Sequence, residues 1–325
     1  MLSNSMAKLA KKKWYKNDVF FYFVLLILLI VLPFFVGSYV LQILILSLIF
    51  AILGLSWNLA AGYSGIFSFG HQAFFGIGAY ASAIISIELE ISPWLGLIIG
   101  GILAAVAGGI ISFPILRLRI IPYIAISTLG FAEIIRLMAS NFSDLTRGEL
   151  GLSGIPAFTS IGPLDFNLAN RINIYFLVLT ILILTVLFIT KIINGPRGLA
   201  LKSMRESQDA AESLGVNLRN NKLYIFMISA FIAGVSGALY AHYVQVLTPS
   251  SEISVDLMLQ ILLIVAIGGM RTVIGPVVGA FIVVIGLEYL RFLGDYRMMV
   301  YGLLIVIVIM FMPEGIIKKI FPKAQ

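Results

Sequence analysis

The sequence contains no cysteine and only two histidines among its 325 residues, and charged residues make up just 11% of it. The lack of cysteine excludes disulfides, thiolate metal ligands and cysteine nucleophiles, while two histidines disfavour a metal site built from imidazoles. A typical soluble domain is about 25% charged and about 45–50% apolar, whereas 60% of this chain is hydrophobic. Too little polar surface remains to cover a water-soluble particle, so the composition indicates a membrane protein.

Motifs of ATP hydrolysis and of hydrolytic catalysis are also missing. There is no Gly-x4-Gly-Lys-Ser/Thr phosphate loop, no His-Glu-x-x-His zinc motif and no Ser/His pair in a nucleophile-elbow context. We therefore expect a chain that is not an enzyme, that binds no metal or cofactor itself and that has no nucleic-acid partner.

Long runs rich in Leu, Ile and Val alternate with short polar breaks along the chain. Only helices or closed barrels satisfy the backbone in lipid, and these runs lack the alternation of barrel strands. We predict an all-α integral membrane protein, a polytopic bundle of about ten transmembrane helices with broken or re-entrant glycine-rich segments. The predicted spans are residues 19–36, 39–61, 71–87, 93–113, 120–139, 172–193, 223–244, 256–267, 275–292 and 297–313.

The distribution of Lys and Arg predicts how the chain is oriented in the membrane. The single membrane domain, residues 19–313, lies between a basic N-terminal segment, residues 1–18, and a basic tail, residues 314–325. Basic residues near span ends remain in the cytoplasm, so both termini and the loop 194–222 are expected there and the loop 140–171 outside. The first apolar run is expected to be retained, because no small-residue cleavage site follows it. The formal net charge of +7 then divides into an acidic outer side and a basic inner side that faces anionic lipid.

The inner loop contains a stretch, residues 199–214, with few helix breakers and with acids and bases three or four residues apart. It predicts one short amphipathic helix parallel to the membrane, with Leu201 and Leu214 on its apolar side and a glycine at its end. The spacing E-x3-A-A-x3-G in this stretch resembles the EAA-type loop of ABC importer permeases, a helix that fits a groove of the ATP-binding subunit. The residues that the resemblance assigns to coupling with the ATPase are Arg205, Glu206, Ala210, Ala211 and Gly215.

A glycine-rich segment, residues 62–80, enters the third predicted span. Small residues permit close helix packing, but non-helical backbone that lines a translocation path is an alternative. The segment closely resembles that of the branched-chain amino-acid ABC permeases, particularly the LivM type. Its candidate path residues are Gly62, Ser64, Gly65, Ser68, Gly70, His71 and Gly76.

Two further stretches resemble the same family. Residues 267–280 resemble the pattern GG-x-G-T-x-x-GP-x-x-GA, with Arg271 in place of a glycine, and predict a tight cytoplasmic turn with close packing. The glycines and proline that form this pattern are Gly268, Gly269, Gly275, Pro276 and Gly279.

The other stretch, residues 127–156, places Glu133 and Arg136 three residues apart within a span. Ionisable residues in a span are costly, so the two either neutralise each other or act in substrate passage. The following outer loop resembles the family pattern T-x-G-x-x-G-L-x-G-I-P, from which Arg147 and Leu150 depart.

Four motifs in the family's order, from about residue 57 to residue 290, identify the chain as resembling a permease subunit of a branched-chain amino-acid ABC importer. The resemblance implies transport of branched-chain or related hydrophobic amino acids across a bacterial-type plasma membrane. It also implies a second homologous permease subunit of the LivH type, two ATP-binding subunits that carry ATP-Mg, and an extracytoplasmic substrate-binding protein.

Three other functions are compatible with parts of the sequence. A urea or short-amide permease of the same family is built alike. An ion-coupled secondary transporter would use Glu133, Arg136, His71 or Glu288 and need no ATPase. A membrane scaffold or sensor is disfavoured, because the sequence shows no appended soluble domain.

Overall fold

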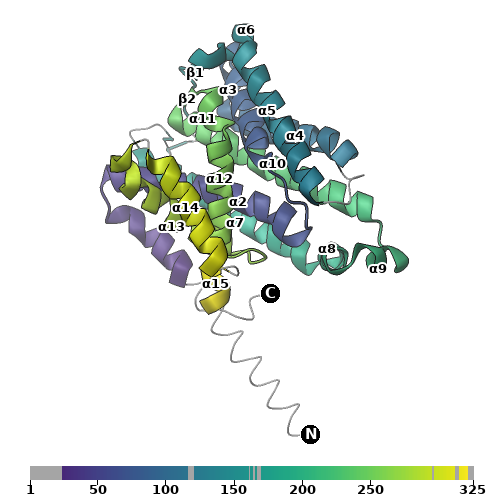
Figure 1. Cartoon of the computed structure of the whole chain (residues 1–325). Helices are drawn as coiled ribbons and strands as arrows, with labels where there is room; N and C mark the ends of the chain where they lie inside the picture. The colour runs from purple at the N-terminus through teal and green to yellow at the C-terminus, as the bar shows by residue number, and fades with distance from the viewer. Residues whose placement is uncertain are drawn as a thin grey trace.

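The computed structural model describes residues 24–115, 121–160, 162–163, 165–166, 170–294, 296–311 and 315–320. The segment 1–18 and half of the tail 314–325 lie outside these residues, and the first predicted span is described only from residue 24. Most of the described chain is helical, which confirms the all-α fold class (Figure 1).

Among the described residues, six helices are long and apolar enough to cross a membrane, and shorter apolar helices accompany them. They follow the predicted spans closely, since each span is an apolar run that must satisfy its own backbone in lipid. The main helices are α2 (Ser38–Asn58), α3 (His71–Glu88), α4 (Pro93–Ile115), α5 (Ile121–Asn141), α7 (Arg171–Asn194), α10 (Leu218–Val244), α12 (Val255–Gly268), α13 (Gly275–Tyr289) and α14 (Tyr296–Phe311). A further apolar helical segment, Val24–Phe34, ends in the 3-10 turn η1 (Leu32–Phe34).

Shorter elements lie at the two ends of the bundle. The outer loop 140–171 holds α6 (Ser143–Thr146), η3 (Gly148–Leu150) and β1 (Leu152–Ser153). Strand β1 pairs antiparallel with β2 (Val246–Leu247), which precedes α11 (Pro249–Glu252). At the opposite end lie α8 (Pro196–Glu206), α9 (Gln208–Ser213) and α15 (Gly315–Ile320). In Figure 1 the elements of the outer loop and those of the inner loop therefore lie at different ends of the bundle.

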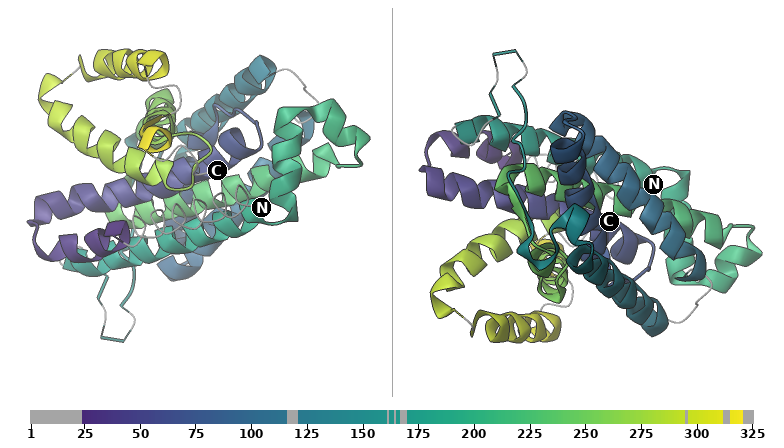
Figure 2. Two further views of the ribbon diagram at one scale, coloured as in Figure 1. Left: turned by 90° about the horizontal axis from the view of Figure 1, so that it is seen from below. Right: turned by 90° about the horizontal axis from the view of Figure 1, so that it is seen from above.

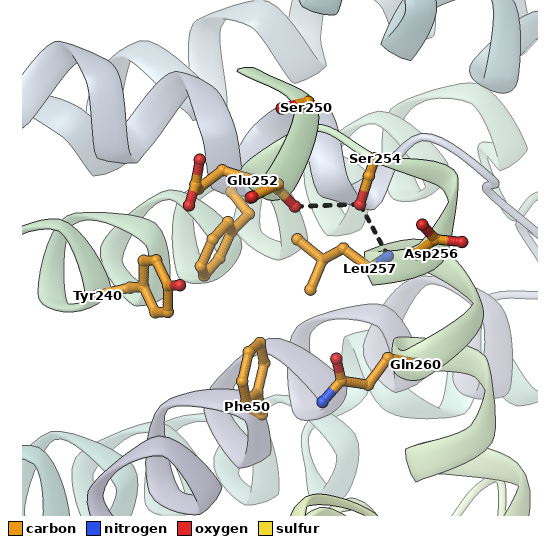
Figure 3. Close-up of a pocket in the computed structure, with 10 residues that line it drawn as sticks. Phe50, Tyr240, Ser250, Glu252, Ser254, Asp256, Leu257 and Gln260 are labelled. Atoms are coloured by element: carbon orange, nitrogen blue, oxygen red, sulfur yellow. Dashed lines mark hydrogen bonds between the residues drawn. The ribbon is translucent and has the colours of Figure 1, made fainter. Parts of the chain in front are cut away.

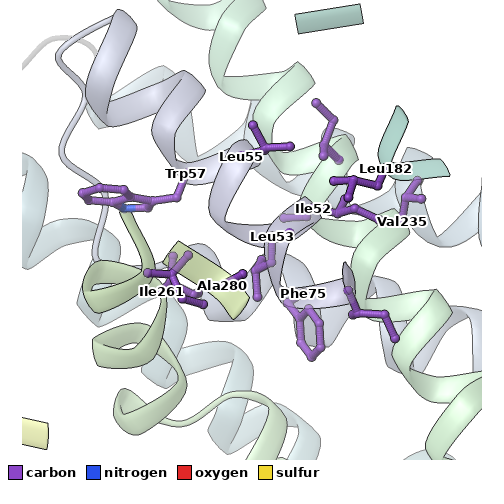
Figure 4. Packing of buried hydrophobic residues seen from close by; sticks show 14 of the residues in the cluster. Ile52, Leu53, Leu55, Trp57, Phe75, Leu182, Val235, Ile261 and Ala280 are labelled. Carbon is purple, nitrogen blue, oxygen red and sulfur yellow. The ribbon is translucent and has the colours of Figure 1, made fainter. Parts of the chain in front are cut away.

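Helix α2 forms the centre of the molecule, because apolar residues cover its whole circumference rather than one stripe. It contacts α7, α10, α12 and α13. Figure 4 shows its side chains packed against residues of these four helices and of α3, and the partners that it labels are Phe75, Leu182, Val235, Ile261 and Ala280. Helix α14 lies at the edge of the bundle (Figure 2). Among the described elements, its main contacts are with α12 and with the 3-10 turn η5 (Leu290–Leu293).

Helices α3, α4 and α10 pack on one another through small residues. A methyl group added at Gly78 of α3 would clash with the backbone of Gly234 in α10, and one at Gly100 of α4 would meet the carbonyl of Gly78. Backbones can approach this closely only where side chains are absent. The glycines of the 62–80 segment thus include helix-packing positions.

Two boundaries differ from the sequence-based expectation. Helix α10 begins at Leu218, five residues before the predicted start at 223, because the Asn217 side chain accepts a hydrogen bond from the Asn220 amide and caps the first turn (2.9 Å). The predicted span 256–267 is preceded by the separate short helix α11, and Ser254 caps α12 by accepting from the Leu257 amide (3.1 Å).

Candidate functional site: the coupling segment and the helix breaks it contacts

The inner loop folds into two short helices instead of one, so the prediction of a single helix over 199–214 is wrong. The chain breaks at Ser207, whose φ of −155° and ψ of 117° are extended, and its hydroxyl accepts a hydrogen bond from the Ala210 amide (3.3 Å). Serine favours such an N-cap over a helix interior. We call α8 and α9 together, residues 196–213, the coupling segment, after the role that the sequence resemblance predicts for it.

The end of the coupling segment is a glycine-dependent turn. Gly215 has a φ of +84°, and a methyl group there would meet no atom within 4 Å. Glycine is therefore required at position 215 because of the backbone conformation, and not because a side chain would lack space. The Val216 amide donates to the Ala211 carbonyl (3.0 Å) and closes the turn.

One face of the coupling segment packs on the bundle and the other is uncovered by the described chain. Leu201, Met204 and Ala211 are buried. Leu214, expected on the apolar side, is instead 82% exposed, because it lies beyond the break at Ser207 and no longer follows the periodicity of α8. Exposed residues of the uncovered face include Glu206 and Ala210.

Arg205 points inward, toward the end of α2. There the helix widens into a π-helical turn, η2 (Leu59–Tyr63), and the Arg205 guanidinium donates to the Gly62 carbonyl (Nη1···O, 3.4 Å). Its other contact is an ion pair with exposed Glu206 (3.2 Å). Arg205 therefore joins the coupling segment to η2.

Two further contacts attach the coupling segment to α10. The Lys222 ammonium donates to the Gln208 side chain of α9 (3.0 Å), and the Arg197 guanidinium of α8 lies 3.6 Å from the centroid of the Tyr224 ring. These contacts make α8, α9 and the N-terminal end of α10 one connected unit.

Residues 64–70, between η2 and α3, are not helical, so the chain is broken here as the glycine pattern predicts. The Trp57 indole donates to the Ser68 carbonyl (2.7 Å), and the Phe69 amide donates to the Thr128 hydroxyl of α5 (2.9 Å). A methyl group at Gly70 would clash with the Thr128 carbonyl. The break is thus held against α5 by hydrogen bonds and close packing.

The other candidates of this segment are buried or turn positions. Ser64 is buried and donates to the Ala60 carbonyl (2.6 Å), and Gly65 has a φ of +75°. A methyl group at Gly76 would clash with Ile253, just after α11. The candidates therefore spread from η2 along α3 instead of lining one described cavity.

His71, at the start of α3, is fully buried in a polar connection between three helices. Its Nε2 lies 2.7 Å from the Ser229 hydroxyl of α10, which donates to the Ser56 carbonyl of α2 (2.6 Å). Within the described ranges, no group of three or more His, Asp and Glu residues could hold a metal ion.

The turn between α12 and α13 is fastened to α2 by one side chain. The Asn58 amide donates to the Thr272 carbonyl (2.8 Å), and its oxygen accepts from the Arg271 amide (3.0 Å). A methyl group at Gly62 would clash with this Asn58 oxygen. The break after α2 and the α12–α13 turn thus share one hydrogen-bonded junction.

Close packing surrounds the turn itself. A methyl group at Gly268 would clash with the Gly275 carbonyl, and one at Gly279 with the Ile264 carbonyl. Gly269 has a φ of +117°, and Pro276 is buried next to Gly275 at the start of α13. Arg271 adopts a φ of +69°, a conformation that glycine takes without steric cost, which explains why the family pattern carries glycine there.

Glu133 and Arg136 are brought together on α5, on a face that the described chain leaves open. The Arg136 Nε donates to Glu133 Oε2 (3.0 Å), and its Nη1 lies 3.9 Å from Glu149 Oε1 of η3. A neighbouring stripe of α5, which includes Ile124 and Ala132, is buried. In the most apolar 18-residue stretch of α5, only 22% of the residues are buried.

Sequence reasoning missed the residues that connect these pieces. Asn58 bonds to the α12–α13 turn, Thr128 to the broken segment before α3, and Ser229 to His71 of α3. A polar residue inside an apolar span is the signal that points to them, because such a group must find a partner in the membrane interior.

The bundle, its long apolar helices and the broken segments define a multi-pass helical membrane protein. Residues 39–309 match the family described as "Branched-chain amino acid transport system / permease component", and the chain belongs to this family.

Its relatives are permeases of two types. The chain is 33% identical, over 90% of its length and 73% of the relative's, to the high-affinity branched-chain amino acid transport system permease protein LivM of Escherichia coli (strain K12). It is 24% identical to a probable LivM permease of Methanocaldococcus jannaschii, covering 83% of this chain and 91% of the relative. The LivH permease of Escherichia coli is 23% identical over the same shares of chain and relative. No solved structure matches the chain significantly.

Proposed function

We propose that this chain is the LivM-type transmembrane subunit of an ABC importer that moves branched-chain amino acids across the plasma membrane. The family match over residues 39–309 carries the proposal, and the names of the LivM relatives support the substrate class. Movement would follow alternating access, driven by ATP hydrolysis on partner subunits.

The coupling segment supports docking of the ATP-binding subunits at its uncovered face. Arg205, Lys222 and Arg197 attach the segment to the bundle, while Glu206 and Ala210 remain exposed. A push on the exposed face can reach η2 through Arg205. The ATPase changes the state of the bundle only if it binds this face differently in the two states.

The open face of α5 supports a second permease subunit. Facing lipid, the Glu133–Arg136 pair would lie in hydrocarbon, where ionisable groups are costly. Against a second subunit of the LivH type, it would lie beside a polar path. Because relatives of both types exist, we infer a permease pair with the path between the two subunits and an extracytoplasmic binding protein above it. The termini and the coupling segment then face the cytoplasm.

Reconstitution tests this function. The chain, its companion permease and the two ATPases are placed in proteoliposomes, the binding protein is added on the side opposite the ATPases, and uptake of radiolabelled leucine is measured. We expect leucine uptake that needs both ATP and the binding protein, and that valine and isoleucine inhibit. Urea uptake without leucine uptake, or leucine uptake driven by an ion gradient without ATPases, would contradict the proposal.

A further inference from the structure

A pocket of about 370 Å³ opens beneath α11 (Figure 3). Helix α11 lies at the end of the bundle that carries β1 and α6 (Figure 1). Five helices contribute to its wall: α2, α3, α10, α11 and α12. The lining residues that matter below are Phe50, Phe75, Tyr240, Glu252, Leu257 and Gln260.

Three aromatic rings form one wall of the pocket. The ring centroids of Phe75 and Tyr240 are 5.3 Å apart, and the Phe50 centroid lies 6.4 Å from Phe75 and 6.3 Å from Tyr240. Leu257 extends toward the same space from α12 (Figure 3). Aromatic faces attract cations as well as apolar chains, so this wall can hold an aliphatic group that carries a positive charge.

A buried carboxylate lies beside the rings. Glu252 is only 4% exposed, and its Oε2 accepts a hydrogen bond from the Thr248 amide (2.6 Å). Within the part of the chain that the structure describes, no lysine or arginine forms an ion pair with it. A buried carboxylate without a counter-charge is costly, and a bound cation would remove that cost.

The Gln260 amide faces Phe50 across the pocket from Glu252 (Figure 3). An amide NH₂ group can donate to a carboxylate. The pocket therefore offers an acceptor for a positive group, a donor for a negative group and an apolar wall between them, which is the pattern of a small-molecule site.

We propose that this pocket binds a primary ammonium group on a short aliphatic chain, as in a branched-chain amino acid. Glu252 pairs with the ammonium, Phe50, Phe75 and Leu257 pack on the aliphatic chain, and Gln260 donates to the carboxylate. The inference rests on the proposed function, and it makes the pocket a site that receives substrate within the permease. A phosphatidylethanolamine headgroup offers the same ammonium chemistry and is the other source.

Direct binding separates the parts of this site. The chain and its companion permease are placed in nanodiscs of phosphatidylglycerol, without ATP or binding protein, and titrated with L-leucine, isoamylamine and 4-methylpentanoate. Leucine and isoamylamine should bind, and 4-methylpentanoate should not, because it lacks the ammonium. Glu252→Gln should weaken both binders about 10- to 100-fold, the range for hydrogen bonds to charged groups. Gln260→Leu should weaken leucine but not isoamylamine.

Two further variants keep the test decisive. Glu88→Gln removes an exposed acid at the end of α3 and should bind like the wild type. Phe50→Leu keeps an apolar side chain and loses the ring, so it should weaken both binders even if Glu252→Gln does not fold. Unchanged binding in folded Glu252→Gln or Phe50→Leu, or no binding of either amine to the wild type, would overturn the proposal.

Lipid and uptake measurements distinguish the remaining readings. Isoamylamine binding that falls when phosphatidylethanolamine is added would identify the headgroup as an occupant of the same site. Leucine uptake by the wild-type assembly together with unchanged binding in Glu252→Gln would refute the pocket as a substrate site and support the proposed transport function. Amine binding that depends on Glu252, in an assembly that imports no branched-chain amino acid, would support the pocket as an ammonium site and refute the proposed transport function.

Discussion

At the scale of single residues, the breaks in the helices are joined by polar side chains that reach across the bundle. Asn58 contacts the backbone of both Arg271 and Thr272, Arg205 reaches Gly62, and Ser229 links His71 to α2. Non-helical backbone in a membrane protein is tolerated where protein satisfies its polar groups. These side chains provide that satisfaction, and they also connect parts of the chain that would have to move together.

Arg205→Ala should separate ATP hydrolysis from transport. The substitution removes the contact with the Gly62 carbonyl and leaves the exposed face of the coupling segment in place. A hydrogen bond from a charged donor contributes about 1.5–3 kcal/mol, so leucine uptake should fall about tenfold while ATP hydrolysis continues. Lys202→Ala on the same helix is the control and should transport normally. Equal uptake in both variants would show that the Arg205 contact with η2 does not link ATP hydrolysis to transport.

The Glu133–Arg136 pair can be exchanged to learn whether it acts as a neutralising pair. Glu133→Gln leaves Arg136 with only the more distant Glu149 and should lower insertion or uptake, because an unpaired charge in a span is costly. The exchange Glu133→Arg with Arg136→Glu should recover most of the uptake, since the i, i+3 geometry is kept. Normal insertion without recovered uptake would instead indicate that the residues act in substrate passage.

At the scale of elements, the sequence predicted where helices run far better than where they break. Apolar runs must be helical in lipid whatever surrounds them, so α4, α7 and α10 follow from composition alone. The break at Ser207 depends on a cap competing with a helix interior, and the exposure of Leu214 depends on that break. The pocket at Glu252 was not predicted, because its walls come from five helices that are distant in sequence.

The packing of α12 on α13 predicts opposite effects for two glycines of the same helix. Gly279→Ala would place a methyl group against the Ile264 carbonyl and should destabilise the chain by about 1–3 kcal/mol, as overpacking does. Gly286→Ala meets no atom within 4 Å and should stabilise α13 by up to about 1 kcal/mol through helix propensity. Thermal unfolding of both variants in detergent measures the difference. Equal midpoints would contradict the close contact at Gly279.

Two changes, one on the coupling segment and one in the glycine turn that follows it, should uncouple the ATPase without disturbing insertion. Glu206→Arg reverses a charge on the exposed face, and Gly215→Pro cannot adopt the observed φ of +84°. Both variants should insert normally and lose substrate-stimulated ATP hydrolysis and uptake together. Glu88→Arg, at the other end of the bundle, is the matched charge reversal and should leave both activities unchanged. Normal stimulation in Glu206→Arg and Gly215→Pro would refute the coupling role.

At the scale of the whole molecule, the two ends of the bundle differ in construction. One end carries the β1–β2 pair, α6, α11 and the pocket, and the other carries the coupling segment and the junction at Asn58 (Figure 1). Substrate delivered at the first end and ATP used at the second would act on opposite sides of the same helices. Helix α2 connects the two ends, since Phe50 lines the pocket and η2 contacts Arg205.

The central claim is that an ATP-binding subunit docks on the coupling segment, and the absence of native cysteine makes a direct test possible. A single cysteine is introduced as Ala210→Cys, labelled with a photoactivatable maleimide and irradiated in the assembled complex. We predict a covalent product with an ATP-binding subunit for Ala210→Cys, and no such product for Glu88→Cys at the opposite end. A product with the substrate-binding protein at Ala210→Cys, or no product with the ATPase, would contradict the account.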